Sequence, residues 1–273
     1  LVFQAYSLIV FLCKKGQEAL NIIVNYFPIY TKLYHIYPNS IMKLKDTLIP
    51  AVFVARPNRF ITIININGNE HKSHLPDPGR LKELLVVGCK LWVRYVKNNS
   101  NRKTNYDTVF VEHKGQLISL ISTLPNAFVK ESLMTNTLSM YKKYKLIKPE
   151  VAIQNHRIDF LLEHQNGDFF YLEVKSVTFV QNGVAKFPDA VTRRGLLHLK
   201  LLQKLISQGY QAGVLFVCQR QDASSFQPMW ERDPHFSSAL VEAYSKGVKI
   251  NCITLNISKS EIRFNTEISL NLE

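Results

Sequence analysis

Three charged residues on two neighbouring apolar segments have the types and spacing that catalysis requires. Asp159 lies in "RIDFLLE", and Glu173 and Lys175 lie in "YLEVKSVTFV". Side chains alternate between the two faces of a strand, so Glu173 and Lys175 point the same way. Lys and Glu are almost never fully buried unless they are paired. The two residues therefore form either an ordinary surface ion pair, which contributes about 0–1 kcal/mol, or part of a site.

The link "HQNGD" between the two segments decides which residue faces Asp159. A two-residue turn at "NG" would place Asp159 opposite Val174. A three-residue loop, "QNG", would place Asp159 opposite Glu173, and Gly167 can supply the left-handed backbone that this loop needs at its third position. Both turns are compatible with the sequence, so both registers remain open at this point.

Opposed carboxylates in the second register would repel each other. A cation between them would remove this cost, and oxygen ligands suit Mg²⁺ or Mn²⁺. Such a metal would hold a phosphate and lower the pKa of a bound water. Lys175 could orient or help deprotonate that water and offset the developing charge. Asp159, Glu173 and Lys175 thus predict a phosphodiesterase site, and a structural cluster of salt bridges is the alternative.

The segments around these residues predict a domain of mixed strands and helices over residues 126–273. Residues 126–145 have apolar residues at helical spacing, and the strand-like "VAIQ", "RIDFLLE" and "FFYLEVKSVTFV" follow. "TRRGLLHLKLLQKLISQGY" predicts an amphipathic helix that stops at Gly209. "AGVLFVCQR" predicts a covered strand parallel to the preceding one. Asp233 and Pro234 predict the start of another helix, with "VKINCITL" and "EIRFNTEI" as final strands.

Residues 42–125 predict a small β-barrel. Short segments rich in β-branched and aromatic residues alternate with turn signals such as "NING" and "NNSN", and a short helix, "RLKELL", interrupts them. Several short strands that close on one another are typical of a barrel. We expect Phe60, Trp92 and Tyr95 to lie in its core rather than to stack on nucleic-acid bases.

The charge balance favours a polyanionic partner. The chain of 273 residues has 34 Lys and Arg against 21 Asp and Glu, a net charge of +13, and is 46% hydrophobic. This excess favours nucleic acid, although a basic globular protein without such a partner is the simpler alternative. The barrel residues that could contact backbone phosphates, unless they are merely solvated, are Arg56, Arg59, Arg94, Lys97, Arg102 and Lys103.

Cysteine usage and hydropathy indicate a cytoplasmic protein. The four cysteines form no C-x-x-C pair, which favours reduced thiols and argues against structural zinc. No apolar run reaches 18 residues, so we expect no membrane span. Patterned sequence begins at Met42. Our hypothesis is that Met42 is the physiological start and that residues 1–41 are translated upstream sequence or a poorly fixed extension.

Several motifs together resemble the sugar fermentation stimulation protein A family. The quoted stretches that carry the resemblance, over roughly residues 48–255, are "RPNRF", "HLPDPGRLKELLVVG", "RKTNYD", "LPNAFVKESL", "RIDFLL", "YLEVKSVT", "NGVAKFPDAVTRRGLLHLKLL" and "VLFVCQR". The resemblance implies an N-terminal OB-like barrel over residues 42–125, followed by a PD-(D/E)xK nuclease-like mixed sheet flanked by helices over residues 126–273. It also implies DNA binding, nuclease activity by analogy of fold, and a link by name to sugar, notably maltose, metabolism.

The resemblance also implies residue roles. Asp159 and Glu173 match the metal-binding carboxylates, and Lys175 matches the catalytic lysine. The residues implied with weaker matches are Glu131 or Glu150 as a further metal ligand, Gln219 as a polar active-site residue, and Asp189 as a recurrent family residue. A charge or cap at a helix N-terminus would explain Asp189 equally well.

Nucleic-acid contacts are expected from basic residues of both domains. These residues are Arg56, Arg59, Arg80, Arg157, Arg193, Arg194 and His198. His156 in "NHRIDF" departs from the small polar residue that the resemblance leads us to expect at that position.

Two functions fit this sequence. The first is a nuclease that uses Mg²⁺ or Mn²⁺ to cut DNA or RNA, and the Asp-Glu-Lys set favours it. The second is a non-catalytic DNA-binding regulator of sugar metabolism. A helix-turn-helix pattern is absent from the sequence, so we expect binding to be directed mainly at the backbone and to depend strongly on salt. The oligomeric state is open, with a homodimer as one option.

Overall fold

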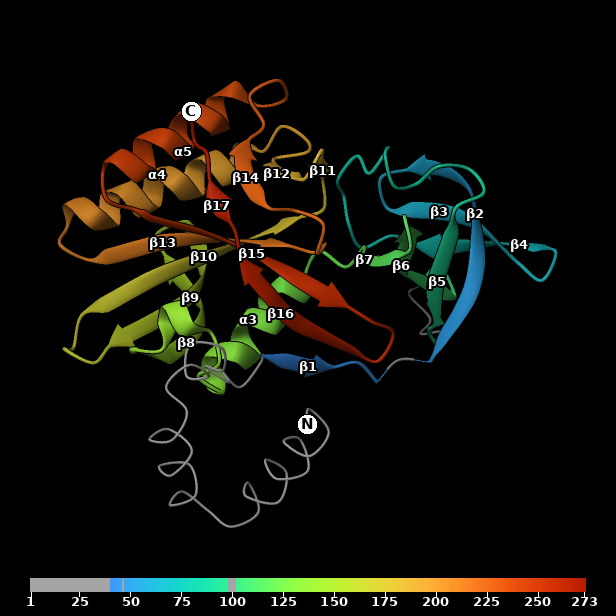
Figure 1. Ribbon diagram of the computed structural model, residues 1–273, viewed down its shortest axis with the longest axis horizontal. Helices are drawn as coiled ribbons and strands as arrows, with labels where there is room; N and C mark the ends of the chain where they lie inside the picture. The colour runs from blue at the N-terminus through green and yellow to red at the C-terminus, as the bar shows by residue number, and fades with distance from the viewer. Residues whose placement is uncertain (1–39, 46, 98–101) are drawn as a thin grey trace, which may run out of the picture. The chain divides into compact units, whose positions relative to one another are not determined.

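The computed structural model describes residues 40–45, 47–97 and 102–273. They form two domains, a barrel followed by a mixed sheet with helices (Figure 1). Most of the proposed extension, residues 1–39, lies outside the described residues. Within them, none of the helices is long and apolar enough to cross a membrane.

Five of the described strands form the closed barrel. They are β2 (Leu48–Asn58), β3 (Ile61–Ile66), β4 (Asn69–His74), β5 (Lys90–Tyr95) and β6 (Tyr106–His113). The sheet order is β4-β3-β2-β5-β6, and a short pairing of β4 with β6 closes it. A further strand, β7 (Gln116–Ser119), pairs with β6. The hairpin between β3 and β4 turns at Asn67 and Gly68, both with positive φ, as the "NING" signal predicts. The OB-like barrel expected from the sequence is confirmed.

Two local expectations in the barrel are wrong. "RLKELL" forms a single turn closed by the Leu85 N–H on the Leu81 carbonyl, because Leu81 has a left-handed backbone that a helix cannot continue. Phe60 and Tyr95 are 49% and 57% exposed, whereas Trp92 is buried, although in the core that the barrel shares with the second domain. The two exposed rings lie in a turn and at the end of a strand, where the barrel does not cover them.

A seven-stranded mixed sheet dominates the described part of the second domain. Its order is β1-β16-β15-β13-β10-β9-β8. The strands are β1 (Ile41–Lys43), β8 (Tyr144–Ile153), β9 (His156–His164), β10 (Phe169–Val177), β13 (Gln211–Cys218), β15 (Lys249–Ile257) and β16 (Glu261–Glu267). The central strands β10 and β13 are parallel, as predicted; β15 is parallel to β13 as well, and antiparallel partners lie outside these three strands. Because β1 pairs with β16, residues 41–43 belong to this sheet, and the barrel begins at β2 rather than at residue 42.

Helices cover the two faces of this sheet. α3 (Leu124–Met134) packs on one face, in a core that also contains Trp92 and Phe110 of the barrel. α4 (Arg193–Ser207) and α5 (Pro234–Ser245) pack on the other face. A small second sheet has the order β11 (Val180–Gln181), β12 (Val184–Phe187), β14 (Ser225–Pro228) and β17 (Ser269–Leu270). The barrel is therefore tied to the second domain by a shared core.

The helix ends follow local chemistry. The Thr192 side chain accepts the Gly195 N–H at the start of α4, and Gly209 has a φ of 86° just beyond its end. Asp233 accepts the Phe236 N–H at the start of α5, as predicted. The helix expected over residues 126–145 instead ends at Met134. The physical reason is Asn136, whose left-handed backbone interrupts the helix, and a short 3-10 helix follows at residues 139–141.

Candidate active site

The β9–β10 hairpin has the three-residue loop. Gly167 has a φ of 92° and donates its N–H to the His164 carbonyl, and the His164 N–H bonds to the Asp168 carbonyl. Strand pairing runs from Phe169 opposite Glu163 to Leu172 opposite Phe160. The same register, continued by one residue, places Asp159 opposite Glu173. The hairpin therefore has the register in which Asp159 is opposite Glu173, and the register of the two-residue turn, with Asp159 opposite Val174, is excluded.

Asp159 lies where β9 and β10 separate. Its Oδ2 accepts the backbone N–H of Val174 in β10 at 2.7 Å, so a side chain of β9, rather than the β9 backbone, takes this N–H. Its Oδ1 accepts a hydrogen bond from the Asn126 side chain of α3 at 2.6 Å. Burial, followed by the negative charge of Glu173, raises the pKa of Asp159 to about 6. The carboxylate is therefore held in a fixed position close to a second negative charge.

Glu173 is buried beside two hydrogen-bond donors. It is 2% exposed, and its Oε1 accepts from Lys175 Nζ at 2.5 Å and from Nδ1 of His198 on α4. An ionised carboxylate can only accept, so the hydrogen lies on His198 Nδ1, and His198 Nε2 accepts from Arg194 at 3.4 Å. Burial alone would raise the pKa of Glu173, but His198 and Lys175 outweigh it, so the pKa lies below its ordinary value. The environment thus holds this buried carboxylate in its charged form.

The oxygen atoms of this pair suit a hard divalent cation. Glu173 Oε2 is buried and has no hydrogen-bond partner. In the described part of the chain, no group of three or more His, Cys, Asp or Glu side chains is placed to hold a metal. Mg²⁺ fits a pair of carboxylates nevertheless, because it usually keeps several waters and takes further oxygens from substrate phosphates. The residues present therefore fit a cation held by Asp159 and Glu173.

The structure does not bring the further metal-ligand candidates to this pair. Glu131 is exposed on α3, about 140° around the helix from Asn126 because it lies five residues further along. Glu150 is exposed as well and forms a surface ion pair with Arg157 at 2.8 Å. Neither glutamate supplies a third carboxylate, and Arg157 is engaged by Glu150.

Gln219 and Asn126 each contact a residue of the β9–β10 hairpin near the site. Gln219 directly follows β13 and is fully buried, and its amide donates to Ser176 Oγ at 2.9 Å, next to Lys175 in sequence. Its Oε1 is buried without a partner. Asn126 was missed by sequence reasoning, because its only signal is a polar residue in the first turn of an apolar helix.

The barrel arginines have different roles. Arg56 is a structural residue, because its guanidinium donates to the backbone carbonyls of Arg80, Arg59 and Asp77. These three hydrogen bonds argue against the predicted phosphate contact of Arg56, because they use donors that such a contact would need. The side chains of Arg59 and Arg80 are exposed, and the Arg59 guanidinium lies 5.9 Å from the centre of the Phe60 ring. These two remain candidates for phosphate contact. Arg94 and Arg102 bond to the buried Asp107, which leaves Lys97 and Lys103 exposed nearby.

The predictions for the α4 region are partly wrong. Arg193 and Arg194 are exposed, as phosphate contacts require. His198 is 2% exposed and bonds to Glu173, so burial prevents the expected contact with a nucleic-acid backbone. Asp189 does not cap α4, because Thr192 does. Instead its Oδ2 accepts the Arg80 N–H from the barrel at 2.9 Å.

Known proteins similar to this chain agree with both domains. A family model described as the SfsA N-terminal OB domain matches residues 54–120, and one described as the sugar fermentation stimulation protein RE domain matches residues 123–261. Two relatives named sugar fermentation stimulation protein homolog come from Moorella thermoacetica and Clostridium tetani. The first is 43% identical over 77% of this chain and 90% of its own length, and the second is 38% identical over 84% and 99%.

A solved structure agrees as well. The structure of Pyrococcus furiosus SfsA in complex with Ca²⁺ is 27% identical, with a TM-score of 0.76 over 84% of this chain and 99% of that chain. The chain therefore belongs to the sugar fermentation stimulation protein (SfsA) family.

Proposed function

We propose that this protein is a divalent-metal-dependent nuclease that hydrolyses phosphodiester bonds of DNA or RNA. The observation that carries the proposal is the placement of Asp159 opposite Glu173, with Lys175 Nζ 2.5 Å from Glu173 Oε1. One buried oxygen of Glu173 has no partner in the protein. An unpartnered buried carboxylate oxygen is costly unless a ligand uses it. A bound cation is the simplest ligand that would do so.

Asp159 and Glu173 would hold Mg²⁺ or Mn²⁺. When bound, such a cation polarises a phosphoryl oxygen and lowers the pKa of a coordinated water. The Pyrococcus furiosus relative was solved in complex with Ca²⁺, a hard cation that takes oxygen ligands, and this supports a cation of the same class here. A purely structural ion cluster is the alternative role for these residues, and such a cluster would not need Asp159 to lie against the charge of Glu173.

The protein's own groups have separable tasks in this proposal. Asn126 and the Val174 N–H fix the two oxygens of Asp159. His198 holds Glu173 through Oε1 and leaves Oε2 available. The Lys175 side chain is 14% exposed, so its ammonium can contact a substrate and donate to the charge that develops on the phosphate.

The charge of the protein supports a nucleic-acid substrate. The chain has a net charge of +13, and Arg59, Arg80, Arg193 and Arg194 are exposed. Contacts from such residues are mainly with the phosphate backbone, so affinity should fall steeply with salt. The same residues would serve a non-catalytic DNA-binding regulator, and only an assay for turnover separates the two functions.

The test is incubation of the purified protein with single- and double-stranded DNA and RNA, in Mg²⁺, Mn²⁺ or EDTA. We expect cleavage that requires metal and is abolished in Glu173→Gln and Lys175→Ala. Glu131→Gln is the matched control, because it removes an exposed carboxylate of the same domain and should retain activity. Cleavage that persists in both site variants would refute the site. Salt-sensitive binding without cleavage of any substrate would favour the regulator.

A further inference from the structure

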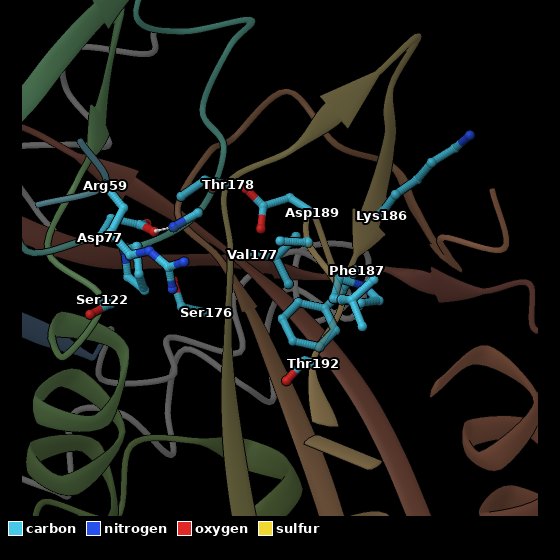
Figure 2. Close-up of a pocket in the computed structure, with 15 residues that line it drawn as sticks. Arg59, Asp77, Ser122, Ser176, Val177, Thr178, Lys186, Phe187, Asp189 and Thr192 are labelled. Carbon is cyan, nitrogen blue, oxygen red and sulfur yellow. Dashed lines mark hydrogen bonds between the residues drawn. The ribbon is translucent and has the colours of Figure 1, made fainter. Parts of the chain in front are cut away.

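A cavity of about 300 Å³ lies between the barrel and the second domain, beside the candidate active site. Its lining comes from the barrel loop at residues 77–79, the end of β10 at residues 176–178, and residues 186–192, which lead from β12 into α4 (Figure 2). We call it the junction cavity. Its volume is at the lower end of the range for small-molecule sites, about 300–1,000 Å³. Neither domain alone provides all of its walls.

The junction cavity is close enough to the active site to hold part of the same substrate. Ser176, in its lining, directly follows Lys175 and lies three residues beyond Glu173, or about 10 Å along a strand. Thr192, also in the lining, precedes His198 by six residues of α4, or about 9 Å along the helix. The estimates along β10 and along α4 therefore give the same separation between the junction cavity and the active site. Adjacent nucleotides of one bound nucleic-acid strand can bridge this separation.

The charges in the cavity show which part of a nucleotide it suits. The carboxylates of Asp77 and Asp189 converge on Gly79, where an added Cβ would lie 2.9 Å from Asp77 Oδ1 and 2.5 Å from Asp189 Oδ2. Asp77 is 7% exposed, and burial is the main cause that raises its pKa to about 6, so its carboxylate is charged above neutral pH. The lining also contains the cations Arg59 and Lys186, but the carboxylate oxygens beside Gly79 repel a phosphate at that point and accept hydrogen bonds from a base.

The remaining wall suits a flat ring. Val177, Phe187 and Pro188 provide apolar surface, and Arg59 lies in the lining as a cation for the backbone. Asp189 uses Oδ2 for the Arg80 N–H, and its carboxylate has further acceptor capacity for a ligand. Among nucleobases, adenine, cytosine and guanine present an exocyclic amino group to such an acceptor, whereas thymine and uracil present carbonyl oxygens instead.

We propose that the junction cavity binds a nucleobase with an exocyclic amino group, on a nucleotide adjacent to the scissile phosphate, with Asp189 as its acceptor. This proposal rests on the proposed function, because the nucleic-acid strand bound in the active site is also the ligand of the junction cavity. It adds a preference between bases, which backbone contacts alone do not provide.

The test measures binding of short fluorescent homopolymers of dA, dC and dT by anisotropy, in EDTA so that no strand is cut. We expect dA and dC to bind about tenfold more tightly than dT, the effect of one good base contact. Asp189→Asn retains an oxygen for the Arg80 N–H but directs amide donors at the base. It should therefore reverse the preference in favour of dT, which loss of fold or of backbone affinity cannot do.

A second variant fills the space. Ala190→Trp, in the lining, should remove the base preference while salt-dependent binding remains. Equal affinity for the three homopolymers, or a preference unchanged in both variants, would overturn the proposal, as would failure of the wild-type protein to bind any strand. A preference that reverses in Asp189→Asn without metal-dependent cleavage would support the base site and contradict the nuclease, so the two proposals fail separately.

Discussion

Replacement of Asp159 by Asn should stabilise the metal-free protein while it abolishes the proposed activity. The pKa of Asp159 is raised from 3.8 to about 6, chiefly by burial and then by the charge of Glu173. This difference corresponds to a charge penalty of about 3 kcal/mol in the folded state at neutral pH. The amide of the substituted side chain carries no charge at any pH and so would avoid the penalty.

Part of that gain is lost in hydrogen bonding. Asp159 accepts one N–H on each oxygen, from Val174 and from Asn126, whereas an Asn side chain has a single oxygen. One donor then lacks its partner, at a cost of about 1–2 kcal/mol. The net expectation is an increase of about 1–2 kcal/mol in the free energy of unfolding, and at about 2–4 °C per kcal/mol a rise in Tm of roughly 2–8 °C.

The pH dependence gives this prediction its signature. Because the folded pKa lies above the unfolded one, the wild-type protein loses stability as the pH rises from about 4 to about 6. The advantage of Asp159→Asn should therefore be full near pH 8 and should disappear toward pH 4, where the charge penalty is mostly gone and the cost of the lost hydrogen bond leaves the variant no more stable than the wild type. Thermal denaturation in EDTA at both pH values measures it.

A metal titration and a control complete the experiment. Mn²⁺ should raise the Tm of the wild-type protein and leave that of Asp159→Asn unchanged, since a ligand stabilises only the state that binds it. Glu131→Gln, which replaces an exposed carboxylate on α3, should behave as wild type throughout. The reasoning is refuted if Asp159→Asn has a lower Tm near pH 8, or if its advantage is the same at both pH values.

Three further outcomes are expected. His198→Leu removes a hydrogen-bond donor from buried Glu173 and should lower the free energy of unfolding by about 2–3 kcal/mol in urea denaturation at neutral pH. Because the pKa of Glu173 is lowered, this loss of stability should shrink as acidification protonates Glu173. A loss of stability that does not change with pH would contradict the pairing. Gly167→Ala should cost about 1 kcal/mol through the left-handed backbone alone, since the added Cβ meets no atom within 4 Å, and an unchanged midpoint would argue against the three-residue loop. Arg59→Ala should weaken nucleic-acid binding and reduce the slope of log binding constant against log salt concentration by about 1, with Tm unchanged. Arg56→Ala should lower Tm, because its guanidinium bonds to backbone carbonyls. The reverse pattern would contradict the roles assigned to the two arginines.

The features predicted correctly from the sequence are those whose causes act within a few residues. The "QNG" loop allowed the register that opposes Asp159 and Glu173, because a glycine at its third position permits the required backbone. Asp233 and Gly209 marked helix ends in the same way, through one side-chain acceptor and one left-handed residue. Strand alternation placed Glu173 and Lys175 on one face without any knowledge of the fold.

Predictions failed where burial or a distant partner decides. Phe60 and Tyr95 have the residue types of a barrel core, but their positions at a turn and a strand end leave them exposed. Arg56 is of a residue type that often contacts phosphates, but its guanidinium donates hydrogen bonds to nearby backbone carbonyls instead. The helix expected to reach residue 145 ended before Asn136, where a polar residue adopts the backbone conformation that a helix excludes.

The amino-acid sequence by itself determined the class of each domain, the hairpin and the identity of the Asp159, Glu173 and Lys175 set. Only the tertiary structure decided what surrounds that set. His198 reaches Glu173 from 25 positions away and Asn126 reaches Asp159 from 33, while the junction cavity needs segments of both domains. Spacing and propensity act along the chain, whereas the environment of a carboxylate depends on which distant side chains the packed core brings against it.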